Sequence, residues 1–385
     1  MRNILFTLLL AGCAALSACG TATSPEEPVS EEPAQIPETE DIPLEMDPVF
    51  RSSTAQISLE EMNRLGFAFG DSLTLTFGSG LVLDDVPFHD GYYVKPNHIV
   101  AVAYPGLPGI NIALNLGEGS WDYYGFQEGE TVSFRLKERG RYLNEQKTFA
   151  QSHSDDINDY PSPEIFANFR PLSGGNIAPD LVFRSATMTN SSMNRADVVD
   201  DLAEQYGIRT VLDFSDTEES LAGFRAADTW HSDYFDRLYE AGSMHVIGLG
   251  VNPASDAFHT DLSNALYNMI QEEGPYLFFC TEGKDRTGYC AALIEALCGA
   301  DYEELLADYM KTYENYYGMT EESSPEQRRA AIETSFDPIM EIMFEVQENE
   351  DLKTVNLEER ARVFFQKGGL TDEQIDTMRR VFTGA

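Results

Sequence analysis

The hydrophobic pattern of the first part of the chain is that of β-strands. Apolar and polar side chains alternate in the segments 72–77 (SLTLTF) and 131–136 (TVSFRL). A two-residue period of this kind places the apolar side chains on one face of a strand. Glycine, proline, asparagine and aspartate gather between such segments, where they mark turns. We therefore predict a small antiparallel β domain over residues 56–155, built as a barrel or a sandwich.

Several aromatic residues lie near the turns of this predicted β domain. They suit either a ligand-binding face or ordinary core and rim positions, because large aromatic side chains are used in both. Core and rim positions are the more frequent use. We expect them here for Tyr92, Tyr93, Trp121, Tyr123 and Tyr124.

Beyond residue 156 the pattern changes to short apolar runs that alternate with amphipathic helical segments. The runs 210–214 (TVLDF) and 276–279 (YLFF) are typical of buried strands. Strands that alternate with helices indicate a sheet of mainly parallel strands. We therefore predict an α/β domain over residues 156–385, with further helices at its C-terminal end. The last of these is expected to begin at a capping box formed by Thr371 and Gln374.

The first 19 residues, MRNILFTLLLAGCAALSAC, have the pattern of an export signal. One arginine precedes an apolar run, and small residues precede a cysteine. The run is too short to indicate a membrane-spanning helix. The segment resembles a bacterial lipoprotein signal, and this resemblance implies that a cysteine is lipidated and becomes the first residue of the mature protein.

Two positions match the lipoprotein pattern, Cys13 in LAGC and Cys19 in LSAC. We prefer Cys19, because it leaves a longer apolar region before it and a polar segment after it. An ordinary cleaved signal peptide remains the alternative. Either form of processing places the mature protein outside the cytoplasmic membrane, and lipidation of Cys19 would anchor it at the extracytoplasmic face.

Residues 20–55 are rich in proline, glutamate, serine and threonine. A segment of this composition buries too little apolar surface to fold, so we predict a disordered acidic tether. The whole chain is also acidic, since 65 Asp and Glu residues against 26 Lys and Arg give a formal charge of -39. This balance argues against the clustered basic surface that nucleic acids require. It also disfavours docking on anionic lipid through basic patches.

Three cysteines remain beyond the signal segment. Cys290 and Cys298 lie on one predicted helix, too far apart along it to form a disulfide. No spacing of cysteine and histidine indicates a zinc site. Cys280 differs from both, because it ends an apolar run and opens a loop, TEGKDRTG, that contains a glycine and an arginine.

The loop after Cys280 has the composition of an anion site. It joins a predicted strand to a predicted helix that begins near Thr287, and N–H groups at a helix N-terminus attract anions. Gly283 allows a tight turn in which several N–H groups converge on one point. Arg286 adds a planar guanidinium that can hold two oxygens of a phosphate. The same positive field favours a thiolate, which would then be a nucleophile beneath the bound phosphate.

The string CTEGKDRTG, residues 280–288, resembles the active-site loop of bacterial tyrosine and lipid phosphatases, Cys-x-x-Gly-Lys-Asp-Arg-Thr-Gly. Further similar strings lie at residues 166–186 (FANFRPLSGGNIAPDLVFRSA), 207–214 (GIRTVLDF) and 305–317 (LLADYMKTYENYY). The resemblance implies a cysteine-dependent phosphatase with that family's mainly parallel sheet flanked by helices. It leaves the β domain unexplained.

By this resemblance Cys280 is the nucleophile of a two-step transfer, and Arg286 holds the phosphate. Thr287 would hydrogen-bond the sulfur and help it to leave in the second step. Asp285 and Asp213 are both candidates for the general acid that protonates the leaving oxygen. The sequence leaves the choice between these two aspartates open.

The rest of the loop is expected to bind the substrate. The resemblance implies backbone donors at Thr281, Glu282, Gly283, Lys284 and Gly288, with the Lys284 side chain near a second anionic group. Phosphotyrosine in proteins, phosphoinositides and inositol phosphates all present a phosphomonoester to such a loop, and the sequence does not choose among them. No metal or organic cofactor is implied.

Two positions depart from the family pattern. Phe279 stands where the family has a histidine before the cysteine, and Ser215 stands where it has an arginine after the first strand. The first change motivates an alternative, a weakly active or inactive surface lipoprotein that binds phosphorylated ligands. The intact Cys280 and Arg286 favour the enzyme, since a binding protein has no need of the thiol. Arg184 is expected to anchor the structure near the site.

Overall fold

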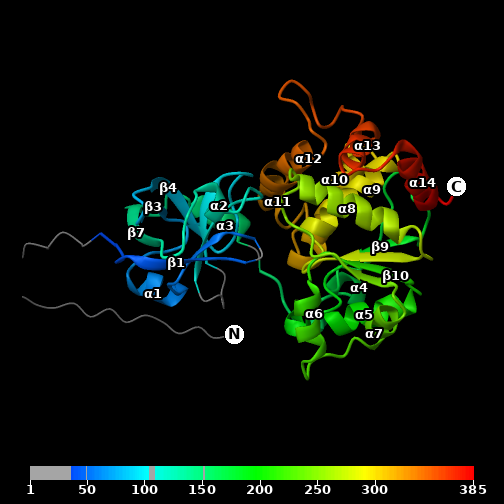
Figure 1. The fold of residues 1–385 in the computed structure, drawn as a ribbon, viewed down its shortest axis with the longest axis horizontal. Helices are drawn as coiled ribbons and strands as arrows, with labels where there is room; N and C mark the ends of the chain where they lie inside the picture. The colour runs from blue at the N-terminus through cyan, green and yellow to red at the C-terminus, as the bar shows by residue number, and fades with distance from the viewer. Residues whose placement is uncertain (1–35, 49, 104–108, 151) are drawn as a thin grey trace, which may run out of the picture. The chain divides into compact units, whose positions relative to one another are not determined.

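The structure is a computed structural model, and it describes residues 36–48, 50–103, 109–150 and 152–385 (Figure 1). The predicted export signal, with Cys19, lies outside the described residues, as does the first part of the predicted tether. Among the helices of the described ranges, none is both long and apolar enough to cross a membrane.

Seven strands of the N-terminal region close into a barrel, in the order β1-β2-β6-β5-β4-β3-β7. These strands are β1 (Ile42–Met46), β2 (Ser53–Ala55), β3 (Ser72–Phe77), β4 (Val82–His89), β5 (Ile99–Val102), β6 (Ile110–Leu114) and β7 (Thr131–Glu138). Neighbours are antiparallel except β4 and β5, which pair in parallel. Three short helices accompany the barrel: α1 (Leu59–Arg64), α2 (Ser120–Tyr123) and α3 (Leu143–Phe149). The predicted β domain is therefore a closed barrel rather than a sandwich.

The core of the barrel is built from the alternating apolar positions. Leu73, Leu75 and Phe77 on β3 are buried, whereas the threonines between them are more exposed. Trp121 and Tyr124 pack against the same core while remaining partly accessible. These two aromatic residues therefore occupy the core and rim positions that were expected.

The barrel begins inside the segment that was predicted to be a tether. Strands β1 and β2 lie within residues 20–55, so the prediction of disorder was wrong for this part of the segment. On β1, Ile42 and Leu44 are buried, and the residue after each of them is exposed. This strand-like alternation is short, and the proline and glutamate around it dominate the composition. β1 pairs with both β2 and β7 and so closes the barrel.

A five-stranded sheet forms the second part of the chain, in the order β11-β10-β12-β9-β8. Its strands are β8 (Arg170–Pro171), β9 (Val182–Ser185), β10 (Thr210–Asp213), β11 (Met244–Val246) and β12 (Tyr276–Phe279). Strands β9 to β12 run parallel, and β8 is antiparallel to its neighbour β9. The mainly parallel sheet is therefore present, and the strands predicted at 210–214 and 276–279 are β10 and β12.

Helices cover both faces of this sheet (Figure 1): α8, α9 and α13 pack on one face, and α5 and α7 on the other. The helices of this part are α4 (Pro163–Phe166), α5 (Ala196–Gln205), α6 (Glu218–Arg225), α7 (Asp233–Glu240), α8 (Asp256–Met269), α9 (Asp285–Leu297), α10 (Tyr302–Tyr317), α11 (Pro325–Ala331), α12 (Asp337–Met343), α13 (Leu357–Lys367) and α14 (Asp372–Thr383), with 3₁₀ turns at Ile157–Asp159 and Ser191–Met193 and a π turn at Ile332–Phe336. The predicted capping box of Thr371 and Gln374 opens α14.

Successive side chains at the end of β12 face opposite sides of the sheet, as in any strand. Leu277 and Phe279 belong to the apolar cluster that α5 and α7 cover. Phe278 and Cys280 belong to the cluster that α8, α9 and α13 cover. Cys280 therefore points to the face on which α9 begins, and Phe279 points away from it.

Candidate active site

Cys280 is the first residue after β12, the central strand of the parallel sheet. It is 3% exposed, and its thiol is free. Helix α9 begins at Asp285, and the capping residue Lys284 supplies no side-chain hydrogen bond to the helix N-terminus. The first N–H groups of a helix have no acceptor within the helix. The loop 280–288 therefore ends in free donors of the kind that bind anions.

Gly283 lets this loop pass close to the end of β9. Its φ angle is +69°, in the left-handed region that favours glycine. A Cβ atom at this position would lie 2.2 Å from the carbonyl oxygen of Ser185. Any larger residue would therefore combine backbone strain with a steric clash, and the loop would have to move.

Two buried side chains hold the loop through its carbonyl groups. Arg184, which is fully buried, donates from Nη2 to the carbonyl oxygen of Gly283 at 2.6 Å. Asn168 donates from Nδ2 to the carbonyl oxygens of Glu282 and Gly283, at 3.1 and 3.3 Å. Across a trans peptide, a carbonyl and the next N–H point in opposite directions. These contacts therefore direct the N–H groups of Gly283 and Lys284 away from Arg184, and they give Arg184 the anchoring position expected for it.

Asp308 on α10 joins this support into an ion-pair network. Its carboxylate pairs with Arg184 and lies 2.9 Å from Nε of Arg170. Burial opposes ionisation of Asp308, but the two guanidinium groups outweigh it and hold the pKa of this carboxyl below its usual value. Asn168 and Asp308 could not be identified as supporting residues from the sequence, because they contact Glu282 and Arg184, which lie 114 and 124 residues away along the chain.

Replacing Asp308 with asparagine is expected to lower the free energy of unfolding by about 3 kcal/mol, because Arg184 and Arg170 would keep their buried charges without the carboxylate. Urea unfolding of the two proteins would measure the change. Glu314→Gln is the matched control, since Glu314 also lies on α10 but pairs with Lys311 and Arg328 while 30% exposed, and an exposed pair contributes at most about 1 kcal/mol. Equal losses in both variants would contradict a special role for the buried network.

Arg286 lies in the first turn of α9 and is oriented by neutral oxygens. Its Nη1 donates to the carbonyl oxygens of Phe214 and Leu249, at 2.9 and 3.4 Å. Its Nη2 lies 3.5 Å from Oγ1 of Thr281. Because these acceptors carry no charge, they position the guanidinium without neutralising it. The positive charge of Arg286 therefore remains at the same end of the sheet as Cys280.

Thr287 follows Arg286 and is fully buried. Within the described ranges its Oγ1 has no hydrogen-bond partner. Buried hydroxyl groups are nearly always paired. The structure thus leaves one unused hydroxyl in the first turn of α9, the turn that follows the loop from Cys280.

The side chain of Lys284 is paired inside the loop. Its Nζ lies 3.2 Å from Oε2 of Glu282 and donates to the hydroxyl of Tyr317 at 3.3 Å. Burial disfavours the ammonium, but Asp285 and Glu282 outweigh it and raise the pKa of Lys284 well above its ordinary value. The anionic neighbour of Lys284 in the structure is therefore a residue of the loop itself.

Asp285 is the first residue of α9, and its side chain is 47% exposed. Burial of the part in contact with the loop raises the pKa of Asp285, and the charge of Lys284, 4.0 Å away, partly offsets this rise. Solvent screening limits the effect, because almost half of the side chain remains exposed. Asp285 is therefore an accessible carboxyl that keeps a proton to somewhat higher pH than an ordinary aspartate.

Asp213 ends β10 and is fully buried. Its Oδ1 accepts hydrogen bonds from the N–H and Oγ of Ser215, at 2.8 and 2.9 Å, and from the N–H of Asp216 at 3.1 Å. Burial, together with the nearby Asp216, raises the pKa of Asp213 well above its ordinary value. Asp213 thus closes the turn after β10, with Ser215 as its partner. It lies opposite Phe279 in the sheet, next to the strand that ends before Cys280, but its own turn holds its Oδ1.

Phe279, where the family pattern has a histidine, is fully buried. It packs in the apolar cluster that α5 and α7 cover, beside residues such as Val211 and Leu277. A histidine at this point would lie among apolar side chains. The phenylalanine therefore completes a core on the face of the sheet opposite to Cys280.

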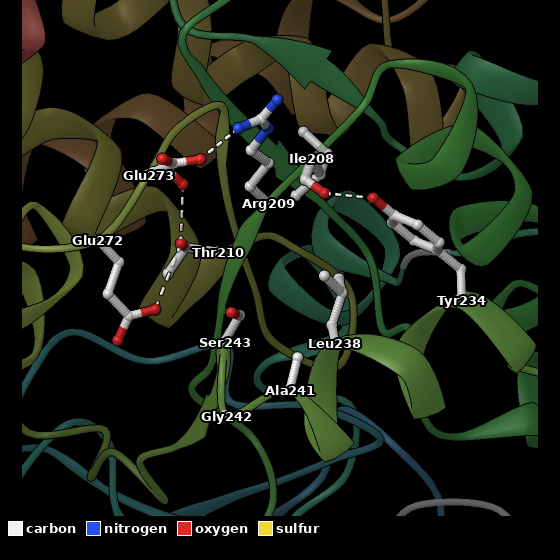
Figure 2. Close-up of a pocket in the computed structure, with 10 residues that line it drawn as sticks. All are labelled: Ile208, Arg209, Thr210, Tyr234, Leu238, Ala241, Gly242, Ser243, Glu272 and Glu273. Atoms are coloured by element: carbon white, nitrogen blue, oxygen red, sulfur yellow. Dashed lines mark hydrogen bonds and ion pairs between the residues drawn. The ribbon is translucent and has the colours of Figure 1, made fainter.

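A pocket of about 510 Å³ lies at the N-terminal ends of the strands of the parallel sheet, opposite to the end that carries Cys280 (Figure 2). Its lining includes Thr210, the first residue of β10, and Glu273, which pairs with Arg209.

Nowhere in the described ranges do three His, Cys, Asp or Glu side chains form a group suited to a metal ion. Ligands of parallel α/β sheets bind at the carboxyl ends of the strands, so we assign the chemistry to the Cys280 end.

Similarity to a known family covers the second part of the chain. A family model described as the tyrosine phosphatase family matches residues 164–384, more than half of the chain. A search of the curated proteins found no match. The core catalytic domain of the PP-IP phosphatase SIW14 from S. cerevisiae, solved in complex with citrate, is 17% identical, with a TM-score of 0.25 over 44% of this chain and 92% of that chain. A second structure of the Siw14 catalytic core is 15% identical, with a TM-score of 0.25 over 44% of this chain and 90% of that chain. Because the family match spans the whole parallel sheet from β8 to β12 and the loop 280–288, this chain belongs to the tyrosine phosphatase family.

Proposed function

We propose that this chain is a cysteine-dependent phosphatase that hydrolyses phosphomonoesters, phosphotyrosine among them, through a phosphocysteine intermediate. The observation that carries the proposal is the position of Cys280, at the end of the central strand and beside the N-terminus of α9. Free N–H groups at a helix N-terminus bind phosphate, and they favour a thiolate over a thiol. Membership of the tyrosine phosphatase family supports the same reaction.

The proposed reaction consists of two displacements. The thiolate of Cys280 attacks phosphorus, an S–P bond forms while the bond to the leaving oxygen breaks, and Asp285 protonates that oxygen. Water then attacks the phosphocysteine, Asp285 takes a proton from this water, and inorganic phosphate leaves as the S–P bond breaks. Arg286 donates two N–H groups to the phosphate oxygens in both steps. The unpaired hydroxyl of Thr287 donates to the sulfur as it leaves.

The substrates of the proposed enzyme are phosphomonoesters on proteins, phosphoinositides or inositol phosphates. The reaction as written uses no metal ion and no organic cofactor. We also place the enzyme at the extracytoplasmic face of the membrane, held by a lipid on Cys19, because residues 1–19 have the pattern of a lipoprotein signal. Mass spectrometry of the protein isolated from membranes would test this part by finding, or failing to find, a lipid on Cys19.

Phosphate release by residues 20–385, the chain without its predicted signal segment and lipidated cysteine, tests the proposed reaction under a reductant that keeps the thiol free. A phosphotyrosine peptide, a phosphoinositide in micelles and an inositol phosphate would be compared over the pH range in which the protein stays folded. We expect turnover of at least one of them. Binding of the phosphopeptide with no turnover at any pH would instead favour a surface protein that binds phosphorylated ligands, the alternative that Phe279 motivates.

Replacing Asp285 with asparagine is expected to lower kcat about 10²-fold for phenyl phosphate, because its basic leaving oxygen needs a proton from the general acid. Nitrophenyl phosphate should lose far less, since nitrophenolate leaves unprotonated. A general acid works only while it carries its proton, and the pKa of Asp285 is raised. The kcat of the wild type should therefore fall at a higher pH than an ordinary aspartate would dictate, and the variant should lack this fall.

Asp213→Asn makes the same chemical change at the buried carboxyl and serves as the comparison. We expect this variant to keep the difference between the two leaving groups, because Asp213 is closed off from solvent by its own turn. The reverse pattern, in which Asp213→Asn abolishes the difference and Asp285→Asn preserves it, would identify Asp213 as the general acid.

A further inference from the structure

Lys284 is the second cation of the loop 280–288, and residues of the protein surround its ammonium. Nζ lies 3.2 Å from Oε2 of Glu282 and donates to the hydroxyl of Tyr317 at 3.3 Å. Nζ also lies 4.0 Å from Oδ2 of Asp285. An ammonium has three N–H donors, and the Lys284 side chain is only 18% exposed. A substrate therefore reaches this charge only by displacing a neighbour that already holds it.

A residue of helix α10 holds the carboxylate of Glu282 beside the ammonium of Lys284. The hydroxyl of Tyr317, the last residue of α10, donates to Oε2 of Glu282 at 2.6 Å. Burial opposes ionisation of Glu282, but Lys284 and this hydrogen bond lower the pKa of the carboxyl below its usual value. The side chain of Glu282 is 29% exposed. Its carboxylate is therefore charged at neutral pH and held in one place.

The pair of Glu282 and Lys284 changes what the loop can accept. A second phosphate beside the one attacked would meet a fixed carboxylate, and it would reach the ammonium only by breaking the ion pair. Like charges repel strongly at close range in a partly buried site. Such repulsion of a competing ligand is a common source of specificity. A substrate with one phosphate on an uncharged group needs only Arg286 and the backbone N–H groups, and it meets no such opposition.

We propose that Glu282 is a specificity-determining residue that selects single phosphomonoesters, such as the phosphotyrosine side chain, against molecules that carry two adjacent phosphates. The inference rests on the proposed function, because the selection is expressed in hydrolysis at Cys280. It narrows the substrate class from any phosphomonoester to those with no second phosphate beside the reacting one. Lys284 then balances Glu282 rather than binding the substrate.

The test compares residues 20–385 with their Glu282→Gln variant on three substrates. These are a phosphotyrosine peptide, an inositol monophosphate, and an inositol bisphosphate with its phosphates on adjacent carbons. Glutamine keeps the size of the side chain and removes its charge. The ratio of kcat/KM for the bisphosphate to kcat/KM for the monophosphate is expected to rise about tenfold or more. A ratio is unaffected by the fraction of enzyme that is folded.

Two further variants separate the Glu282 effect from other causes. Glu273→Gln removes the same charge at an exposed site, where Glu273 pairs with Arg209 at the other end of the sheet, and it should leave the ratio at the wild-type value. Adding Lys284→Gln to Glu282→Gln should return the ratio toward the wild-type value, because the freed cation is lost again. Glu282→Ala, which also removes the carboxylate, gives a second measurement if the glutamine variant folds poorly.

The possible results are distinct. A ratio that rises in both Glu282 variants and stays unchanged in Glu273→Gln supports the selection. Hydrolysis of all three substrates with an unchanged ratio in the Glu282 variants overturns the selection and leaves the proposed phosphatase intact. Absence of turnover by every protein on every substrate overturns the proposed function and the selection together.

Discussion

Cys280→Ser is expected to lower kcat/KM for a phosphotyrosine peptide by about 10⁴-fold or more, the order of loss that follows removal of an enzyme's nucleophile. A cysteine thiolate is a strong nucleophile, whereas a serine hydroxyl without a neighbouring base is a weak one. The substitution therefore removes the attacking group and barely changes its size. Phosphate release at high enzyme concentration would measure the residual rate. Binding of the peptide should persist, because Arg286 and the backbone donors remain.

Cys298→Ser is the matched control for this experiment. Cys298 caps the other end of the same helix, α9, and burial raises the pKa of its thiol to about 12. That thiol therefore stays protonated and has no part in the proposed reaction. The control should keep the wild-type kcat/KM per folded molecule. A Cys280→Ser protein that retained more than about a tenth of the activity would rule out Cys280 as the nucleophile.

Arg286→Met is expected to lower kcat/KM by about 10³–10⁵-fold, the range that a guanidinium contributes to phosphoryl transfer. Methionine fills a comparable volume but carries neither charge nor N–H groups. The loss should appear in both kcat and KM, because the guanidinium contacts the phosphate before and during the transfer. Initial rates over a range of peptide concentrations would separate the two.

The control for Arg286→Met is Arg209→Met. Arg209 is 59% exposed and pairs with Glu273 at the opposite ends of the strands, so its loss should leave both constants near their wild-type values. Thermal unfolding of both variants would show whether the fold is kept. A loss of less than about tenfold in a folded Arg286→Met protein would exclude this arginine as the phosphate clamp.

The central part of the site could be predicted because its signals are contiguous in the sequence. The apolar run of β12, the glycine and arginine of the loop and the helical pattern of α9 follow one another without interruption. Each of these is a local signal that depends on side-chain period or on backbone preference. The proposed nucleophile Cys280, the strand before it and the helix after it could therefore be identified from the sequence alone.

The support of the loop could not be predicted, because it depends on contacts between distant segments. Asn168 and Arg184 reach Gly283 across 115 and 99 residues of chain. No spacing rule links a buried asparagine to a carbonyl group in another element. The hydrogen bond from Tyr317 to Glu282 could not be predicted for the same reason, because it forms only when the end of α10 lies beside the loop.

The prediction of disorder was wrong at the start of the barrel because it relied on amino-acid composition. Proline and glutamate dominate residues 20–55, and a segment of that kind is usually unfolded. Strand β1 is only 5 residues long, so its alternation carries little weight against its surroundings. Its partners on β2 and β7 supply the stability that its own composition lacks.

The position of β1 has a consequence for how the chain assembles. All strands of the barrel come from residues 42–138, and all strands of the parallel sheet come from residues 170–279. A chain that emerges N-terminus first can therefore finish the barrel before the second sheet exists. Without β1, strands β2 and β7 would each keep a row of unpaired N–H and C=O groups, which other chains can pair with. The 5 residues of β1, which lie in the acidic, proline-rich segment 20–55, thus cover strand edges through which newly made molecules could aggregate.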